Sequence, residues 1–156
     1  MITLSEIQQA HKRIKPYIIE TPIVRLPNLD KILGCRVYAK PECLQVTGSF
    51  KIRGALNKML QLSKNELSKG VVAASSGNHG KALCYGAKLL GSRASIVIPS
   101  SAPEVKEKAI LALGGEVTRA NVTKRFEVAE QICKEKGAIF IHPFNDLDVI
   151  AGQGTL

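Results

Sequence analysis

The sequence predicts an α/β protein, a three-layer α/β/α domain built on a four-stranded parallel sheet. From Gly70 onward, short apolar runs alternate with amphipathic stretches of about ten to fourteen residues, which is the pattern of right-handed βαβ units. The apolar runs are continuous, so they indicate strands that are buried on both faces. Gly91, Gly114 and Gly137 close the helical stretches. We expect this domain to cover residues 46–144.

The segment before the sheet predicts short, separate elements. Residues 5–15 predict a helix that Pro16 ends. Prolines at positions 22 and 27 exclude a helix between them, so residues 20–27 are expected to be extended. Alternating polar and apolar residues at 36–40 predict a short strand, and residues 50–62 predict a helix.

The regular part follows in order. The predicted strands are residues 71–74, 94–98, 116–119 and 138–141, and the predicted helices between them are residues 81–90, 103–113 and 123–136. Sequential parallel strands need crossover helices that cover both faces of the sheet, which gives the three layers.

Composition excludes several classes of protein. A hydrophobic fraction of 45% over 156 residues is typical of one packed domain. Apolar runs long enough to cross a bilayer and a signal-peptide pattern are both missing, so we expect a cytoplasmic protein without a membrane partner. The net charge of +9 suggests nucleic acid, but the basic residues alternate with acidic ones and aromatics make up only 4%, so we expect no nucleic-acid partner.

Four cysteines are scattered along the chain without a C-x-x-C pair or a matching histidine spacing. We therefore expect free thiols that are mostly buried, with no disulfide framework and no metal site.

Two motifs carry the chemistry, and the first is Thr47-Gly48-Ser49-Phe50-Lys51-Ile52-Arg53-Gly54. If Ser49 is the N-cap, Lys51 lies in the first turn of a helix, where the dipole disfavours an ammonium. Burial beside Phe50 would disfavour the charge further, and both effects favour the neutral, nucleophilic amine used in Schiff-base chemistry. The alternative is that Lys51, Arg53 and Lys58 form the solvated face of an amphipathic helix.

The second motif, Ser75-Ser76-Gly77-Asn78-His79-Gly80, comes directly after the first predicted strand of the sheet and opens a helix. The carboxyl end of a parallel strand is where open α/β sheets bind anions and ligands. The alternative is a tight turn with a polar helix cap. Its glycines do not make a dinucleotide fingerprint, and an RNA-clamping G-x-x-G loop lies between two helices instead.

Together the two motifs closely resemble those of the fold-type II pyridoxal-phosphate enzymes, which include threonine and serine dehydratases and serine racemase. The resemblance continues along the whole chain. It includes Glu20-Thr21-Pro22, Arg125-Phe126, His142-Pro143-Phe144 and Ala151-Gly152-Gln153-Gly154-Thr155.

The resemblance implies pyridoxal 5'-phosphate as cofactor and a small amino acid as substrate. It assigns Lys51 to cofactor attachment and to movement of the Cα proton, Phe50 to packing against the cofactor ring, and Asn78 to its phenolic oxygen. Four loop residues are implied to hold the substrate carboxylate, with Arg125 as a helper: Ser75, Ser76, Asn78 and His79. Lys81 departs from the family, which usually has glutamine there, and leaves substrate preference open.

The resemblance also implies that family members are about twice as long, and that the glycine-rich loop for the cofactor phosphate lies in the second half. We therefore expect an N-terminal part of a longer protein, with residues 1–45 and 145–156 belonging to a second, larger domain. Exposed apolar residues such as Ile23, Val24 and Val37 then predict self-association into a homo-oligomer.

The expected activity is that of an L-threonine or L-serine ammonia-lyase, which gives a 2-oxo acid and ammonia. Serine racemase is the close alternative, because Ser76 is present as the acid that the resemblance places on the opposite face. A different class of function stays open, namely a catalytically silent part that binds carboxylates or assembles with a partner. We expect this chain alone to be inactive.

Overall fold

A parallel sheet of four strands forms the centre of the computed structural model, which describes residues 1–75 and 77–156. The strands are β3 (Val71–Ala74), β4 (Ala94–Pro99), β5 (Glu116–Ala120) and β6 (Ile139–Phe140), in the spatial order β5-β4-β3-β6. Each neighbouring pair is parallel. The predicted four-stranded parallel sheet is therefore confirmed.

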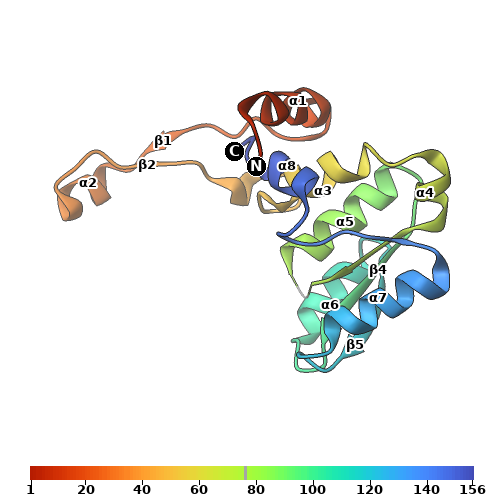
Figure 1. The fold of residues 1–156 in the computed structure, drawn as a ribbon. Coiled ribbons are helices and arrows are strands. Elements are labelled where there is room, and N and C mark those ends of the chain that lie inside the picture. The colour runs from red at the N-terminus through yellow and green to blue at the C-terminus, as the bar shows by residue number, and fades with distance from the viewer. Residues whose placement is uncertain (76) are drawn as a thin grey trace.

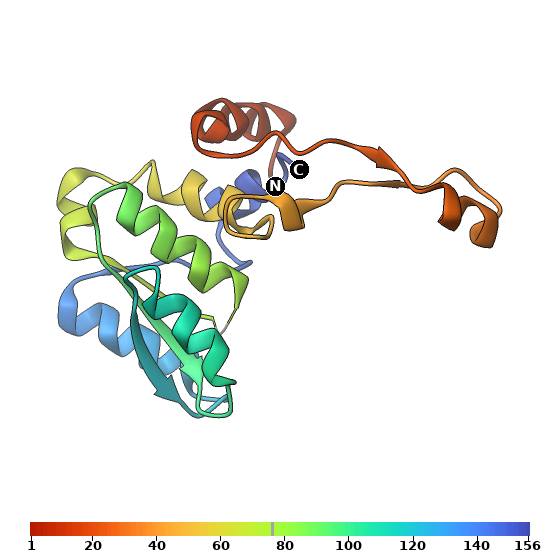
Figure 2. The same cartoon turned by 180° about the vertical axis from the view of Figure 1, so that it is seen from behind.

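Helices cover both faces of this sheet (Figures 1 and 2). Helices α5 (Asn78–Leu89) and α6 (Glu104–Leu111) pack on one face, and α7 (Arg125–Lys136) packs on the other. The predicted α/β/α layering is confirmed, and each βα unit begins and ends within a few residues of its predicted position.

The central strands β3 and β4 are largely apolar because both of their faces are buried, whereas the edge strand β5 is partly exposed and carries Glu116 and Arg119. Val71 and Ala73 belong to the cluster under α5, whereas Val72 and Ala74 belong to the cluster under α7. All four side chains are at most 3% exposed. This two-sided burial explains the continuous apolar runs of the sequence.

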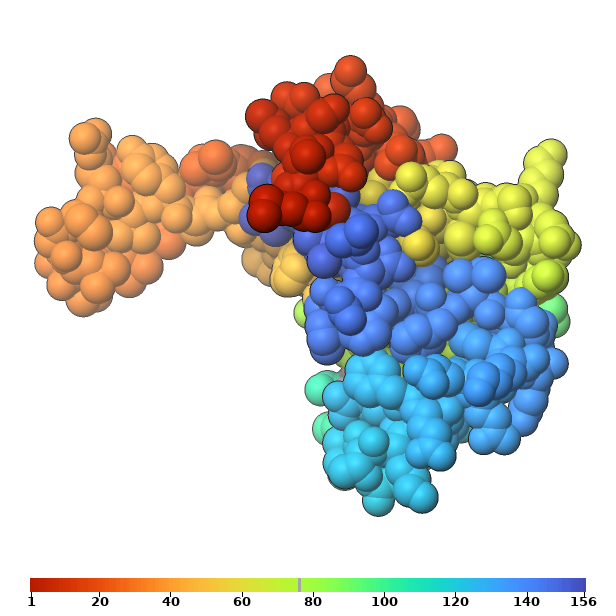
Figure 3. Space-filling view, in the orientation of Figure 1, coloured from red at the N-terminus to blue at the C-terminus, as the bar shows by residue number. Residues whose placement is uncertain are grey.

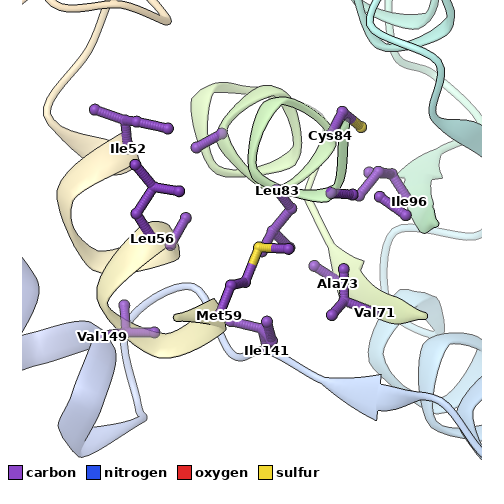
Figure 4. Packing of buried hydrophobic residues seen from close by; sticks show 14 of the residues in the cluster. Ile52, Leu56, Met59, Val71, Ala73, Leu83, Cys84, Ile96, Ile141 and Val149 are labelled. Atoms are coloured by element: carbon purple, nitrogen blue, oxygen red, sulfur yellow. The ribbon is translucent and has the colours of Figure 1, made fainter. Parts of the chain in front are cut away.

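Helix α3 (Lys51–Met59) extends the first cluster away from the sheet. Its side chains Ile52, Leu56 and Met59 are fully buried and point toward Leu83 of α5 (Figure 4). Truncating a buried leucine of this kind costs about 2–5 kcal/mol. The core therefore fixes α3, and with it Lys51, relative to the sheet.

Both ends of the chain pack on α3. Helix α1 (Leu4–Ile14) continues into the 3₁₀ turn η1 (Lys15–Tyr17), and α8 (Leu147–Gln153) is the last helix. Ile14 and Val149 join the same buried cluster as α3. The domain boundaries expected at residues 45 and 144 stay a prediction.

Residues 23–39, which we call the arm, project away from the rest of the protein (Figure 3). Strands β1 (Val24–Arg25) and β2 (Tyr38–Ala39) pair antiparallel, α2 (Pro27–Leu33) forms the tip, and the turn η2 (Glu42–Leu44) follows. Helix α2 was not predicted from the sequence; it begins with Pro27 in its first turn and is capped at its end by Gly34, which has φ 67°.

One further helix prediction needs correction, and a second short helix was not predicted. The helix expected over residues 50–62 ends at Met59, and a separate helix α4 (Lys64–Lys69) follows. Its signal was present in the sequence, because Ser63 and Glu66 form a capping box. Helix α4 has only six residues, which is too short for an apolar period to show in the sequence.

The expectation of mostly buried thiols is wrong. Cys35 and Cys43 are exposed, Cys133 is half-buried and only Cys84 is buried. Cys35 and Cys43 lie at or beside the arm, where little packs over them. Within residues 1–75 and 77–156, no helix is long and apolar enough to span a bilayer.

Candidate active site

Lys51 is the first residue of α3, but the helix is not capped as the sequence predicted. The N-cap residue is Phe50, whose backbone is already helical at φ −61° and ψ −16°, so no side chain caps the helix. The prediction that Ser49 is the N-cap is therefore wrong. Ser49 Oγ is buried and has no hydrogen-bond partner among the described residues.

The Lys51 amine lies in a partly buried position at the carboxyl edge of the sheet. Its Nζ donates a hydrogen bond of 3.1 Å to the carbonyl oxygen of Pro143, which follows β6. Nζ also lies 5.0 Å from the centroid of the Phe50 ring. Burial lowers the pKa of Lys51 below its ordinary value, and the positive end of α3 acts in the same direction. The neutral amine is thereby favoured, as a nucleophile or base requires.

The loop after β3 is built for a tight turn into α5. Ser75 Oγ accepts hydrogen bonds of 3.3 Å from the N–H groups of Gly77 and Gly80. A Cβ atom on Gly80 would lie 2.9 Å from both Ile96 Cγ2 and Ser75 O, so only glycine allows this approach to the sheet. Ser76 lies outside the described residues, and its predicted role stays a prediction.

Asn78 and His79 begin α5 in very different surroundings. Asn78 is exposed at the start of the helix, whereas His79 is only 2% exposed. His79 Nε2 lies 3.1 Å from the carbonyl oxygen of Ile141, so Nε2 carries the proton of the neutral ring. Burial, with Lys51 and His142 nearby, lowers the pKa of His79 to about 4.

This burial limits how His79 could hold a substrate carboxylate. Its ring faces Ile141, so the group left near the loop is its backbone N–H, which in the first turn of α5 has no partner within the helix. The predicted carboxylate-binding roles of Ser75, Asn78 and His79 remain predictions. The structure does bring the three residues to one end of α5.

Arg125 is less well placed than the resemblance suggests. It begins α7, donates a hydrogen bond of 3.1 Å to the carbonyl oxygen of Val122, and lies 5.1 Å from the Phe126 ring centroid. Within the described part of the chain, its guanidinium has no hydrogen bond to Lys51 or to the loop after β3. Its role as a helper stays a prediction.

Two residues that follow β6, Ile141 and Pro143, also face the candidate site, and no role was predicted for them. The carbonyl oxygen of Ile141 faces His79, and that of Pro143 accepts from Lys51. Both residues follow a parallel strand at the same edge as Ser75. The rule that ligands bind at the carboxyl ends of strands was therefore a usable signal for them.

The solvated-face interpretation of the first motif is wrong for Arg53. Its side chain is 3% exposed and forms two hydrogen bonds of 2.8 Å to the carboxylate of Glu42. Thr21 donates a further bond of 2.7 Å to Glu42. Burial would raise the pKa of Glu42, but Arg53 and Thr21 lower it overall, so the pair is charged. This network fastens the base of the arm to α3.

The sequence of this chain also matches that of a known protein family. The family described as "Pyridoxal-phosphate dependent enzyme" matches residues 14–156. The chain belongs to this family. The matched range includes Lys51 and the loop after β3, and the roles that the resemblance implies for them stay predictions.

The chain has similar sequence identity to relatives that are named as racemases and to relatives that are named as lyases. The chain is 46% identical over 156 residues to serine racemase from Dictyostelium discoideum, covering 99% of this chain and 48% of the relative. It is 44% identical over 158 residues to L-threonine ammonia-lyase from Thermotoga maritima, covering 100% of this chain and 39% of the relative. The chain therefore spans about half the length of these curated relatives, or less.

Solved structures agree on the fold. The crystal structure of serine racemase from Dictyostelium discoideum superposes with a TM-score of 0.91 at 46% identity, covering 99% of this chain and 51% of that one. Structure and sequence together therefore place the chain among the fold-type II enzymes that contain ammonia-lyases and racemases.

Proposed function

We propose that this chain is the N-terminal half of a pyridoxal-phosphate-dependent ammonia-lyase that acts on L-threonine or L-serine. The observation that carries the proposal is the Lys51 amine, which is partly buried, has a lowered pKa and lies at the carboxyl edge of a parallel sheet. The relatives named L-threonine ammonia-lyase and serine racemase support it.

The residues at this edge fit the cofactor. Lys51 provides the amine that would hold its aldehyde carbon, and the exposed Asn78 would face its phenolic oxygen. Phe50 remains 37% exposed, which leaves a ring face for packing. A Cβ on Gly77 would meet nothing within 4 Å, so there is open space beside the loop.

When bound, pyridoxal phosphate supplies an electron sink for the Cα atom of an amino acid. The chain's own groups supply the rest. Lys51 in its neutral form takes the Cα proton, and its contact with Pro143 O keeps Nζ at one place. Ser75, Asn78 and the free N–H groups at the start of α5 hold the substrate carboxylate, whose charge the helix dipole favours.

Serine racemase is the second candidate, because a serine racemase shows 46% identity and an ammonia-lyase 44%. Racemisation requires an acid on the opposite face of the substrate, and we assign this role to Ser76. A Ser76→Ala variant should then lose D-serine formation and keep 2-oxo acid formation.

The test uses the protein encoded by the complete reading frame that contains this chain. We expect 2-oxo acid from L-threonine or L-serine, and a loss of roughly 10²- to 10⁴-fold or more in Lys51→Ala, since the variant lacks the base. Lys134→Ala is the control, because Lys134 is exposed and lies in the last turn of α7, away from the proposed site. Full activity in Lys51→Ala would overturn the proposal.

A further inference from the structure

His142 holds a turn of backbone beside Lys51. Its Nδ1 atom accepts hydrogen bonds from two backbone N–H groups, that of Phe144 at 3.3 Å and that of Asn145 at 2.8 Å. The ring thus does for residues 142–145 what an asparagine side chain does in an Asx turn.

Three aromatic rings hold the imidazole in this orientation. Phe126 of α7 stacks on it at 5.3 Å between centroids and 13° between planes. Phe144 meets it edge-on at 4.5 Å and Phe140 at 5.9 Å. A ring packed on three sides has little freedom to rotate, so the turn that it accepts from is fixed as well.

The two peptide carbonyls on either side of His142 contact the site. Ile141 O faces Nε2 of His79, and Pro143 O accepts from Lys51 Nζ, each at 3.1 Å. Pro143 is itself buried. The turn that His142 stabilises therefore decides where the acceptor of the Lys51 amine lies.

We propose that His142 is a positioning residue for Lys51, and that it acts by holding residues 142–145 so that the Pro143 carbonyl restrains the Lys51 amine. Its significance for catalysis rests on the function proposed above. The physical coupling between His142 and Lys51 does not, because it exists in this chain whatever reaction the protein catalyses.

The coupling depends on a neutral imidazole, since a protonated Nδ1 cannot accept a hydrogen bond. Burial lowers the pKa of His142, while the nearby carboxylate of Asp146 opposes this effect. The other charged or titratable groups near the ring include Arg125, whose guanidinium lies 5.1 Å from the centroid of the Phe126 ring, and His79 on α5. At neutral pH the ring is neutral and the turn is formed.

Acetylation of the 156-residue chain by acetic anhydride at pH 7.5 tests the coupling, with mass spectrometry comparing Lys51 with the exposed Lys106 in each sample. His142→Phe keeps the aromatic packing but removes the acceptor. We expect the Lys51 to Lys106 labelling ratio to rise roughly two- to tenfold, as release of one hydrogen bond implies. His142→Asn restores an acceptor and should keep the wild-type ratio.

A pH series on the unaltered chain keeps the proposal testable if His142→Phe does not fold. The labelling ratio should rise, and the Asn145 amide should lose protection from hydrogen exchange, at the pH where the His142 ring takes up a proton. His142→Asn should show neither change. A ratio that stays constant in His142→Phe, or through the titration of His142 in the unaltered chain, would overturn the proposal.

The outcome is separable from that of the proposed function. Labelling requires neither cofactor nor substrate, so a failure here says nothing against Lys51 as the catalytic lysine. Conversely, full 2-oxo acid formation in Lys51→Ala would overturn the proposed function but not the coupling between His142 and Lys51, because the labelling experiment reports that coupling directly.

Discussion

His79 is the residue whose surroundings bear most directly on pH dependence. Its ring is almost fully buried, with Nε2 on the carbonyl of Ile141 and Nδ1 without a partner among the described residues. A buried imidazole with one unpaired nitrogen has no favourable place for a second proton. The folded protein therefore resists protonation of His79 down to about pH 4.

We predict that the free energy of unfolding falls as the pH drops from about 6.5 to about 4. The unfolded chain binds a proton at His79 near pH 6.5, whereas the folded chain does so only near its lowered pKa of about 4. The unfolded state then binds more protons in this window, so the stability that is present above pH 6.5 is lost on acidification, by about 3 kcal/mol. Urea unfolding at pH 7, 5.5 and 4 measures this loss.

His79→Gln is the matched variant for this experiment. Its amide can still donate to the carbonyl of Ile141 but does not titrate, so the loss of stability between pH 7 and pH 4 should be smaller by the same amount. Other groups that titrate in this range, His142 among them, contribute equally to both proteins. Equal losses in the two proteins would contradict the assignment to His79.

At the scale of elements, the crossing of α3 and α8 explains two glycines. A Cβ on Gly152 would lie 2.6 Å from both Arg53 O and Gly54 Cα, and a Cβ on Gly54 would lie 2.7 Å from Val149 O. The two helices touch through their backbones at this point. Gly54 and Gly152 therefore contact each other at the crossing of the two helices.

We predict that Gly152→Ala destabilises the chain by about 1–3 kcal/mol, because the contact is with backbone that cannot move without displacing α3. The better helix propensity of alanine offsets part of this cost. Gly154→Ala is the control, since its Cβ would meet the end of the Ile7 side chain, which can rotate. Chemical unfolding of both variants measures the difference, and equal stabilities would contradict the backbone contact.

The regular elements could be predicted from the sequence because their signals are local. Strands β3 and β4 are short apolar runs, and α5, α6 and α7 are each followed within a few residues by a glycine, namely Gly91, Gly114 and Gly137. The helix α2 and the helix α4 were missed because seven and six residues are too few for a period to show. Only their caps, Pro27 and the Ser63–Glu66 box, could have revealed them.

The site could be predicted only in part. Lys51 and the loop after β3 could be proposed as site residues because each motif is contiguous in the sequence, and their roles stay predictions. The carbonyls of Ile141 and Pro143 were not, because a backbone acceptor has no side-chain signature of its own; only the general rule on the ends of parallel strands pointed to them. Pro143 lies 92 residues from Lys51 in the sequence, and Ile141 lies 62 residues from His79. The pairing of Arg53 with Glu42 was missed for the same reason, because a buried ion pair and a solvated face use the same residue types.

At the scale of the whole molecule, the arm is the part with the least packing of its own. Its apolar side chains are widely exposed, with Ile23 at 70%, Ile32 at 76% and Leu33 at 60%. Val37 is half-buried, so the exposure expected there is smaller than at Ile23. Several large apolar side chains exposed on one projecting segment favour association with another surface.

We predict that the 156-residue chain self-associates through the arm, because pairing of two arms removes this apolar surface from water. Ile32→Glu at the tip should shift the chain toward monomer in sedimentation velocity experiments over a range of concentrations. Leu4→Glu is the control, since Leu4 is 69% exposed but lies on α1. A chain that stays monomeric at high concentration would contradict the prediction.

The 156-residue chain should bind pyridoxal phosphate covalently but should not retain it. The amine of Lys51 is accessible, so a covalent adduct with the aldehyde should form and be trapped there by borohydride. Retention of the cofactor also requires hydrogen bonds to its phosphate group, and each charge-assisted hydrogen bond of this kind contributes roughly 1.5–3 kcal/mol to binding. Two N–H groups of the loop after β3, those of Gly77 and Gly80, already donate to Ser75 Oγ.

With few donors left for the phosphate, and with Phe50 and Asn78 open to water, the adduct on Lys51 should hydrolyse and the cofactor should leave. We therefore expect the yellow colour of the incubated chain to disappear on dialysis, and no 2-oxo acid from serine or threonine. Lys51→Ala gives the background of adducts on other lysines. Colour that survives dialysis in the unaltered chain and not in Lys51→Ala, together with 2-oxo acid formation, would show that these 156 residues alone grip the cofactor.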